Sequence, residues 1–235
     1  MSGFTLVVTE GLLEVAVGEK LLDTLGVDRT YTRFIPKGGR VVFWREVTRY
    51  NNAARRSGPI LGLADLEHEP CPSGVIAQHL PHGREVAFVL RIAERMLESW
   101  LLADRASIAK FLRVGVGRIP SNPESEANPK LTLVNAARYS TRREIRDDIV
   151  PKEGSEGIVG RGYSSRIGEF IRQNWQPFNA QASSQSLRRA IAAIRAATLT
   201  TLRLPNRYLT RRLTSHHNAR LTVVLGLGVM KSQNR

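Results

Sequence analysis

The sequence has little cysteine, because Cys71 is the only one in 235 residues. A single thiol excludes a disulfide within the chain and is typical of proteins in a reducing compartment. Long apolar runs are also missing, since no uncharged stretch reaches the roughly 18 residues that cross a bilayer. The first residues lack the basic flank and the small-residue cleavage site of a secretory signal. The sequence therefore predicts a cytoplasmic protein that does not associate with a membrane.

Two glycine-rich motifs that bind nucleotide phosphates are missing as well. Neither a G-x-x-x-x-G-K-[ST] loop nor a G-x-G-x-x-G turn occurs in the chain. We therefore expect no intrinsic ATPase activity, and any dependence on ATP would have to come from a partner protein.

Acidic residues are missing from the last part of the chain, where none follows Glu169. Residues 1–104 hold 12 Lys and Arg and 13 Asp and Glu, whereas residues 105–235 hold 23 and 8. A near-neutral half is thus joined to a cationic half, and the chain has a formal net charge of +14. Such a field attracts phosphate backbones with little regard to sequence. We expect DNA or RNA as a partner; the alternatives are a tail that adheres to ribosomes or membranes, or a merely solvated surface.

Strand-like and helix-like segments alternate through the first half of the chain. Apolar or β-rich runs predict strands at 4–10, 30–36, 59–65 and 85–93. Apolar spacing and end signals predict helices at 11–26, 40–56, 71–80 and 94–112. This alternation predicts an α/β fold, a doubly wound parallel sheet with helices on both faces.

The second half is predicted to be a basic, mainly helical region. The stretch 115–130 is rich in Gly, Pro, Ser and Asn, which indicates a loop or linker. We accordingly predict two domains, at 1–112 and 113–235. Helical patches are predicted at 131–149, 163–174 and 183–204, and the apolar run 220–230 could be a late strand.

Arginines of this basic region are the candidates for phosphate contacts. Arg188, Arg189 and Arg195 lie off the apolar face of the helix predicted at its C-terminal end. Arg161 and Arg166 flank a Gly-rich loop whose backbone N–H groups could hold phosphate. We predict that these five residues contact nucleic acid.

Carboxylates follow two of the predicted strands. Glu10 ends the first strand and Asp65 ends the third, and ligands of such sheets bind at the carboxyl ends of the strands. Since residues i and i+2 of an extended strand point to the same side, Glu67 would point with Asp65. Crowded carboxylates repel one another, so the arrangement favours a divalent cation, Mg²⁺ or Mn²⁺, between them. The alternative is a group of solvated acids that caps a strand end.

Two more acids are candidates for the same site. Glu14 lies one helical turn after the first of these carboxylates and could extend the metal site, or be an ordinary exposed helix charge. Glu98 falls on the apolar side of its helix, where a buried carboxylate needs a partner, either the metal or an arginine such as Arg91 or Arg95. Tyr163 is interpreted as a packing residue and not as a nucleophile.

The segment VVTEGLLE, followed later by LADLE, resembles the Toprim domain of topoisomerases, primases and OLD-type nucleases. A family of uncharacterised Toprim-like proteins, often encoded beside ATPases in bacterial defence loci, is similar to four further segments: DLEHEPCP, RMLESWLLAD, IVPKEGSEGIVGRGYSSRIGEFI and SLRRAI. The resemblance implies a Toprim-like fold, with Glu10 as the general acid/base or metal-organising residue and Asp65 and Glu67 as metal ligands. Toprim domains usually have Asp where Glu67 stands.

These observations favour a Mg²⁺- or Mn²⁺-dependent nuclease that cleaves phosphodiester bonds of DNA or RNA. The resemblance implies that it is the effector of an anti-phage defence system with an ATPase partner. The alternative is a catalytically silent nucleic-acid-binding subunit of such a complex, and a different phosphotransferase using the same acids is a third hypothesis. Each of them is compatible with a homo-oligomer.

Overall fold

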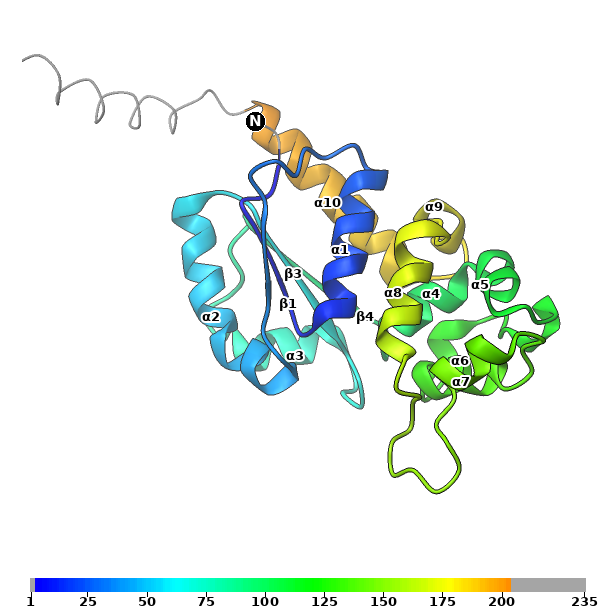
Figure 1. Ribbon diagram of the computed structural model, residues 1–235. Helices are drawn as coiled ribbons and strands as arrows, with labels where there is room; N and C mark the ends of the chain where they lie inside the picture. The colour runs from blue at the N-terminus through cyan, green and yellow to red at the C-terminus, as the bar shows by residue number, and fades with distance from the viewer. Residues whose placement is uncertain (1–2, 204–235) are drawn as a thin grey trace, which may run out of the picture. The chain divides into compact units, whose positions relative to one another are not determined.

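Four parallel strands form one sheet in the order β2-β1-β3-β4 (Figure 1). A computed structural model describes residues 3–203 of the chain. The strands are β1 (Leu6–Thr9), β2 (Arg33–Pro36), β3 (Ile60–Asp65) and β4 (Phe88–Ala93). Because Thr9 of β1 is in register with Leu63 of β3, the residues that follow the two strands emerge at the same edge. The predicted α/β fold with a parallel sheet is confirmed.

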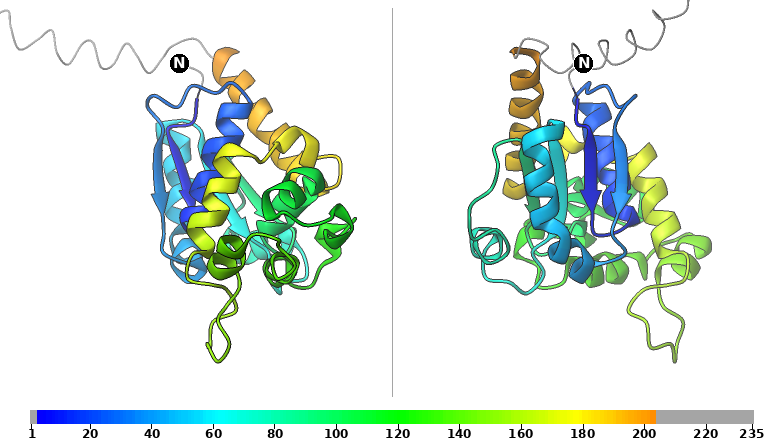
Figure 2. Two further views of the ribbon diagram at one scale, coloured as in Figure 1. Left: turned by 45° about the vertical axis from the view of Figure 1, so that its right-hand side comes forward. Right: turned by 90° about the vertical axis from the view of Figure 1, so that its left-hand side faces the viewer.

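Helices cover both faces of the sheet (Figure 2). One face is covered by α2 (Arg40–Ser57) and α3 (Pro72–His79), and α1 (Leu12–Thr24) lies on the other. Successive side chains of a strand point to opposite faces; accordingly, Val7 packs in the core that contains α1, and Val8 in the core that contains α2. Every residue of β3 is buried, as expected for a continuous apolar strand that is covered on both sides.

The remaining helices extend the core on the α1 side of the sheet. They are α4 (Glu98–Ala103), α5 (Arg105–Leu112), α6 (Pro129–Ala137), α7 (Arg143–Ile149), α8 (Tyr163–Gln173), α9 (Pro177–Ala180) and α10 (Gln185–Arg203), with short 3₁₀ turns at η1 (Val116–Arg118) and η2 (Pro123–Ser125). A continuous hydrophobic core contains Trp100 and Trp175, and the Trp175 indole N–H donates to the Trp100 carbonyl at 3.2 Å. Among the described residues, those up to Thr201 form one compact unit. The two domains predicted at 1–112 and 113–235 therefore share one hydrophobic core, as far as residues 3–203 describe them.

The stretch predicted as a linker, 115–130, is fixed to the start of α10. The Glu124 carboxylate accepts hydrogen bonds from the Ser184 hydroxyl at 2.6 Å and from the backbone N–H groups of Gln185 and Ser186, both at 2.9 Å. These N–H groups are free of intrahelical partners at the first turn of a helix, where a negative charge is also favourable. Glu124 thus caps a helix that begins far away in the sequence.

Within residues 3–203, no helix has both the length and the apolar character that a membrane span requires. The apolar run predicted as a strand at 220–230 lies outside the described residues.

Candidate active site

Two carboxylates meet at the carboxyl edge of the sheet. Glu10 directly follows β1, and Asp65 is the last residue of β3. The backbone N–H of Asp65 donates to Oε1 of Glu10 at 3.3 Å. Because Glu10 is only 7% exposed and Asp65 only 8%, the pair lies inside the protein, which does not fit the alternative of solvated acids at a strand end.

Two further carboxylates approach this pair from helices. Glu98 is the first residue of α4 and is 3% exposed, and Glu14 lies in the first turn of α1. Repulsion from both acids acts on Asp65, which places them in its electrostatic neighbourhood. Asp65 is held in position by the backbone N–H of Leu97, which donates to Oδ1 at 2.9 Å. The four acids Glu10, Glu14, Asp65 and Glu98 are called the acid cluster below.

Burial and mutual repulsion raise the pKa values of three of these acids, Glu10, Glu14 and Asp65. Burial raises the pKa of Glu10 from its ordinary 4.5 to about 7, although the hydrogen bond from Asp65 and the attraction of Arg40 oppose the shift. The pKa of Asp65 lies well above its ordinary value, because the side chain is buried and is repelled by Glu98 and Glu14. Burial, followed by repulsion from Glu98, also raises the pKa of Glu14. Such carboxylates favour taking up a proton or a cation near neutral pH.

Lys130 enters the acid cluster from α6, and Tyr163 enters it from the start of α8. The Lys130 Nζ atom lies 3.6 Å from Oε1 of Glu98, and the Tyr163 hydroxyl donates to the same oxygen at 2.8 Å. Burial lowers the pKa of Lys130, but attraction from Glu98, Asp65 and Glu14 outweighs burial and raises it overall. Burial and repulsion from Glu98 raise the pKa of Tyr163 well above its ordinary value. Lys130 is therefore charged and Tyr163 neutral at physiological pH.

The partners of Glu98 differ from those that the sequence suggested. Arg91 and Arg95 donate to backbone carbonyl oxygens, and Lys130 and Tyr163 take the place beside Glu98. Tyr163 does pack in the core, as predicted, but it also donates the hydrogen bond that fixes this carboxylate. No local pattern marks Lys130, because its contact with Glu98 joins segments that are far apart in the chain.

Glu67 departs from the geometry on which its prediction rested. β3 ends at Asp65, and the backbone of Glu67 is left-handed with φ of 54°. The alternation of an extended strand therefore does not continue to Glu67, and the expectation that it points with Asp65 for that reason is wrong. The Glu67 carboxylate lies 3.4 Å from Nε of Arg40. Its predicted role as a catalytic residue and metal ligand stays a prediction.

Arg40 connects the loop after β3 to the acid cluster. Its Nη1 atom donates to the Asp65 carbonyl at 2.6 Å and lies 4.0 Å from Oε1 of Glu10. Its Nη2 atom contacts Oε1 of Glu69 at 3.4 Å. Sequence reasoning missed this residue, although one signal exists. Arg40 is the first residue of α2, and a cation is unfavourable at the positive end of a helix unless acidic partners compensate it.

The donor atoms at this edge are of the kind that Mg²⁺ or Mn²⁺ binds, because they are carboxylate oxygens. Oε2 of Glu10 and Oδ2 of Asp65 accept no hydrogen bond from the described residues. As the side chains stand, however, no three Asp, Glu, His or Cys residues of the described part of the chain form a metal-binding group. The donor chemistry fits a divalent ion, and binding one would require these side chains to turn toward a common point.

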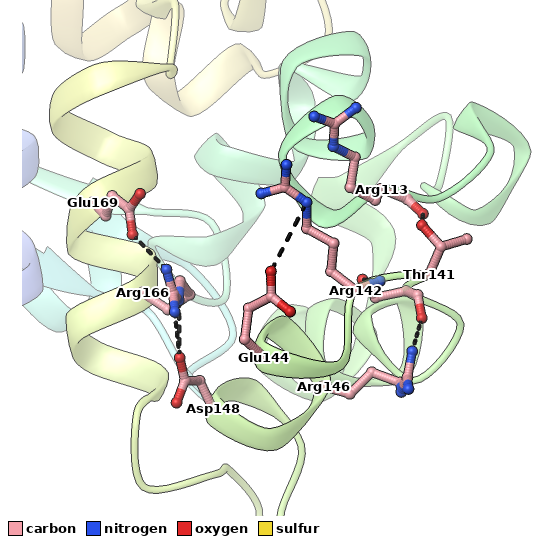
Figure 3. Close-up of polar contacts among 9 residues, drawn as sticks. Arg113, Thr141, Arg142, Glu144, Arg146, Asp148, Arg166 and Glu169 are labelled. Atoms are coloured by element: carbon pink, nitrogen blue, oxygen red, sulfur yellow. Dashed lines mark hydrogen bonds and ion pairs between the residues drawn. The ribbon is translucent and has the colours of Figure 1, made fainter.

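The predicted nucleic-acid-binding arginines fall into two groups. Four of them have exposed side chains: Arg161, Arg188, Arg189 and Arg195. Arg166 instead lies between Asp148 and Glu169, with ion pairs of 2.6 Å and 2.9 Å (Figure 3). Two carboxylates thus compensate its charge, which leaves less of it for a phosphate than the sequence suggested.

Comparison of the chain with protein-family models, with curated proteins and with solved structures finds no match in any of the three.

Proposed function

We propose that the chain is a divalent-metal-dependent nuclease that cleaves phosphodiester bonds of DNA or RNA. The observation that carries this proposal is the acid cluster, which lies inside the carboxyl edge of a parallel sheet. Burying acids without full compensation is unfavourable for folding. Strongly perturbed carboxylates at such an edge are therefore a reason to infer a catalytic site. The excess of positive charge in the chain would attract a polyanionic substrate.

Glu10 and Asp65 would hold the metal ion, with Glu14 or Glu98 as the next ligand and Glu67 as a more distant candidate. A bound divalent ion would polarise a phosphoryl oxygen and lower the pKa of a water molecule. A cation would also relieve the repulsion that raises the pKa values of Asp65 and Glu14.

The chain's own residues would position and charge the site. The Leu97 N–H and the Tyr163 hydroxyl each hold one oxygen of a cluster acid, which leaves the second oxygen of each carboxylate for a ligand. If Glu10 does not bind the metal itself, its pKa of about 7 suits it for proton exchange with substrate or water at neutral pH. The Lys130 ammonium would stabilise negative charge that develops on a phosphate in the transition state.

The test is a cleavage assay of the full chain, alone and with an ATPase partner, on single- and double-stranded DNA and RNA. Cleavage should require Mg²⁺ or Mn²⁺ and disappear in EDTA. Asp65→Asn keeps the size of the side chain and an acceptor for the Leu97 N–H but removes the charge, so it should abolish cleavage without unfolding the protein. Glu156→Gln, at an exposed position, is the control and should cleave like wild type. Equal cleavage in EDTA, or none with any substrate, metal and partner, contradicts the proposal.

A catalytically silent nucleic-acid-binding subunit is the second candidate, and Lys130 is the observation that favours it. Its ammonium group already supplies a cation to the acid cluster. If that charge replaces a metal ion, Mg²⁺ should not raise the melting temperature of wild type, and nucleic acid should bind without being cut. A melting temperature that rises with Mg²⁺ in wild type and not in Asp65→Asn argues for the nuclease.

A further inference from the structure

A cavity lies away from the acid cluster, between α5, α7 and α8. Its volume is about 500 Å³, within the range of pockets that bind small molecules. None of the acids of the cluster lines it, and neither do Lys130 or Tyr163. Any ligand of this cavity would therefore be recognised by residues that the proposed nuclease site does not use.

Cations dominate one side of this cavity. Lys110 and Arg113, at the end of α5, line it together with Arg142, which precedes α7. Within the described residues, the Lys110 and Arg113 side chains form no ion pair with a carboxylate, and Arg142 approaches only Glu144, at 4.0 Å. In Figure 3 the Arg113 and Arg142 side chains extend toward the same space. Glu144 also lines the cavity on this side, so three cations face one carboxylate, and the net positive charge favours an anionic ligand.

The opposite wall has its charges already paired. Arg166 and Glu169 of α8 also line the cavity, and Arg166 is held between Asp148 and Glu169 (Figure 3). These bonds hold the side chains of this wall in place and neutralise the charge of Arg166. The uncompensated positive charge of the cavity therefore lies on the α5 side. The cavity therefore has an oriented charge distribution, with its available donors at one end.

The backbone at Arg113 has an unusual conformation for an arginine. Its φ of 56° and ψ of 47° lie in the left-handed region, which side chains other than glycine, asparagine and aspartate rarely adopt. The Thr141 N–H donates to the Arg113 carbonyl at 3.4 Å and holds the turn. Glycine would suit this turn better, so the turn itself does not explain the arginine, whereas a function of its side chain would.

An aromatic surface lies beside the cations. Phe111 lines the cavity, is half-buried, and is backed by Phe170 with ring centres 5.2 Å apart. Aromatic side chains of this kind are used by proteins to stack nucleic-acid bases, and neighbouring cations hold the phosphates. The side-chain amides of Gln173 and Asn174 also line the cavity and could donate to or accept from a base edge.

We propose that this cavity binds a phosphate group together with the base next to it. Arg113, Arg142 and Lys110 would contact the phosphate, and Phe111 would contact the base. A free nucleotide and a segment of a nucleic-acid strand both present this chemistry. The proposal concerns binding at a separate site, so it stands or fails independently of metal-dependent cleavage.

The test measures binding of the full chain to two probes in EDTA, where the proposed cleavage cannot occur. One probe is a labelled nucleoside triphosphate, and the other is a short labelled single-stranded oligonucleotide. The binding of each probe is measured by fluorescence anisotropy at physiological salt. Arg113→Gly removes one charge and suits the left-handed backbone, so the variant should remain folded. Arg142→Gln removes one charge at the same side of the cavity. Arg143→Gln is the matched control, because Arg143 is exposed, does not line the cavity and carries the same charge.

Arg113→Gly and Arg142→Gln should each weaken binding about tenfold, the effect of losing one charge-assisted hydrogen bond, whereas Arg143→Gln should bind like wild type. A loss for the triphosphate identifies a nucleotide site, and a loss for the oligonucleotide alone identifies a strand-binding site. If both cavity variants bind both probes as tightly as Arg143→Gln does, or if wild type binds neither probe, the proposal is wrong.

Discussion

Replacing Glu10 by glutamine should stabilise the fold at alkaline pH in metal-free buffer. Glu10 is 7% exposed, and burial raises the pKa of its carboxyl group from 4.5 to about 7. Since one pKa unit corresponds to about 1.4 kcal/mol, a shift of roughly 2.5 units makes ionisation of Glu10 cost roughly 3 kcal/mol of folding free energy. Glutamine has a similar size, can still accept from the Asp65 N–H, and does not ionise.

The direction of the pH dependence follows from which state holds the proton. Below pH 4.5 the carboxyl group is protonated in both the folded and the unfolded chain and makes no difference. As the pH rises from 4.5 to about 7, the unfolded chain releases its proton first, and the free energy of unfolding falls. Glu10→Gln lacks this loss. The free energy of unfolding of the variant should therefore exceed that of wild type by near zero at pH 4.5 and by roughly 3 kcal/mol at about pH 8.

Urea denaturation in EDTA at a series of pH values measures this difference, and the fluorescence of Trp100 and Trp175, both buried, reports unfolding. The exposed Glu156→Gln changes the net charge equally and controls for general electrostatics. The difference in the free energy of unfolding between this variant and wild type should not change with pH. Adding Mg²⁺ at alkaline pH should stabilise wild type more than Glu10→Gln. The reasoning would be refuted if the difference in the free energy of unfolding between Glu10→Gln and wild type stayed constant with pH, or if the variant were less stable than wild type at alkaline pH.

Three other changes test the surroundings of the site. Lys130→Met should lower the free energy of unfolding by about 2 kcal/mol or more, because buried carboxylates lose their cation; urea denaturation at neutral pH measures this, and an unchanged midpoint contradicts it. Glu124→Gln should cost about 2 kcal/mol in the same assay through a weaker cap of α10. Burial raises the pKa of Glu124, but its hydrogen bonds outweigh burial and lower it, so the wild-type advantage should disappear as the pH falls through that lowered value. Changing Arg188, Arg189 and Arg195 to Glu should weaken nucleic-acid binding across sequences and reduce the salt dependence by about one unit of slope per lost contact. An unchanged slope in a folded variant excludes that surface.

The sheet and the two central acids could be predicted because the responsible signals are local. An unbroken apolar run indicates a strand that is covered on both faces, and β3 is buried throughout. Once two such strands are parallel and adjacent, the residues that follow them lie at one edge. Glu10 and Asp65 are therefore neighbours because of the fold, and the hydrogen bond between them is a consequence of the register of β1 and β3.

The rest of the site depends on contacts that local patterns do not contain. Lys130 and Tyr163 reach Glu98 only because α6 and α8 pack near α4, and the Tyr163–Glu98 bond joins residues 65 positions apart. Glu67 was misplaced because its left-handed backbone is not indicated by a glycine or an asparagine at that position. The pairing of Arg166 with Glu169, three residues later in α8, is a helical spacing that sequence reasoning could have found.

Several partly buried carboxylates elsewhere in the chain are compensated by cations or hydrogen-bond donors, and this contrast strengthens the inference about the acid cluster. With 35 Lys and Arg against 21 Asp and Glu, cations are abundant, and other partly buried acids are compensated. Asp148 and Glu169 share Arg166, and Glu124 receives the donors of a helix start. The acid cluster is different, because Glu10, Glu14 and Asp65 all keep raised pKa values despite Arg40 and Lys130. Folding alone would favour replacing such acids by apolar residues of similar volume. The proposed function supplies a reason for their presence, because it requires carboxylates that hold a cation at this edge of the sheet.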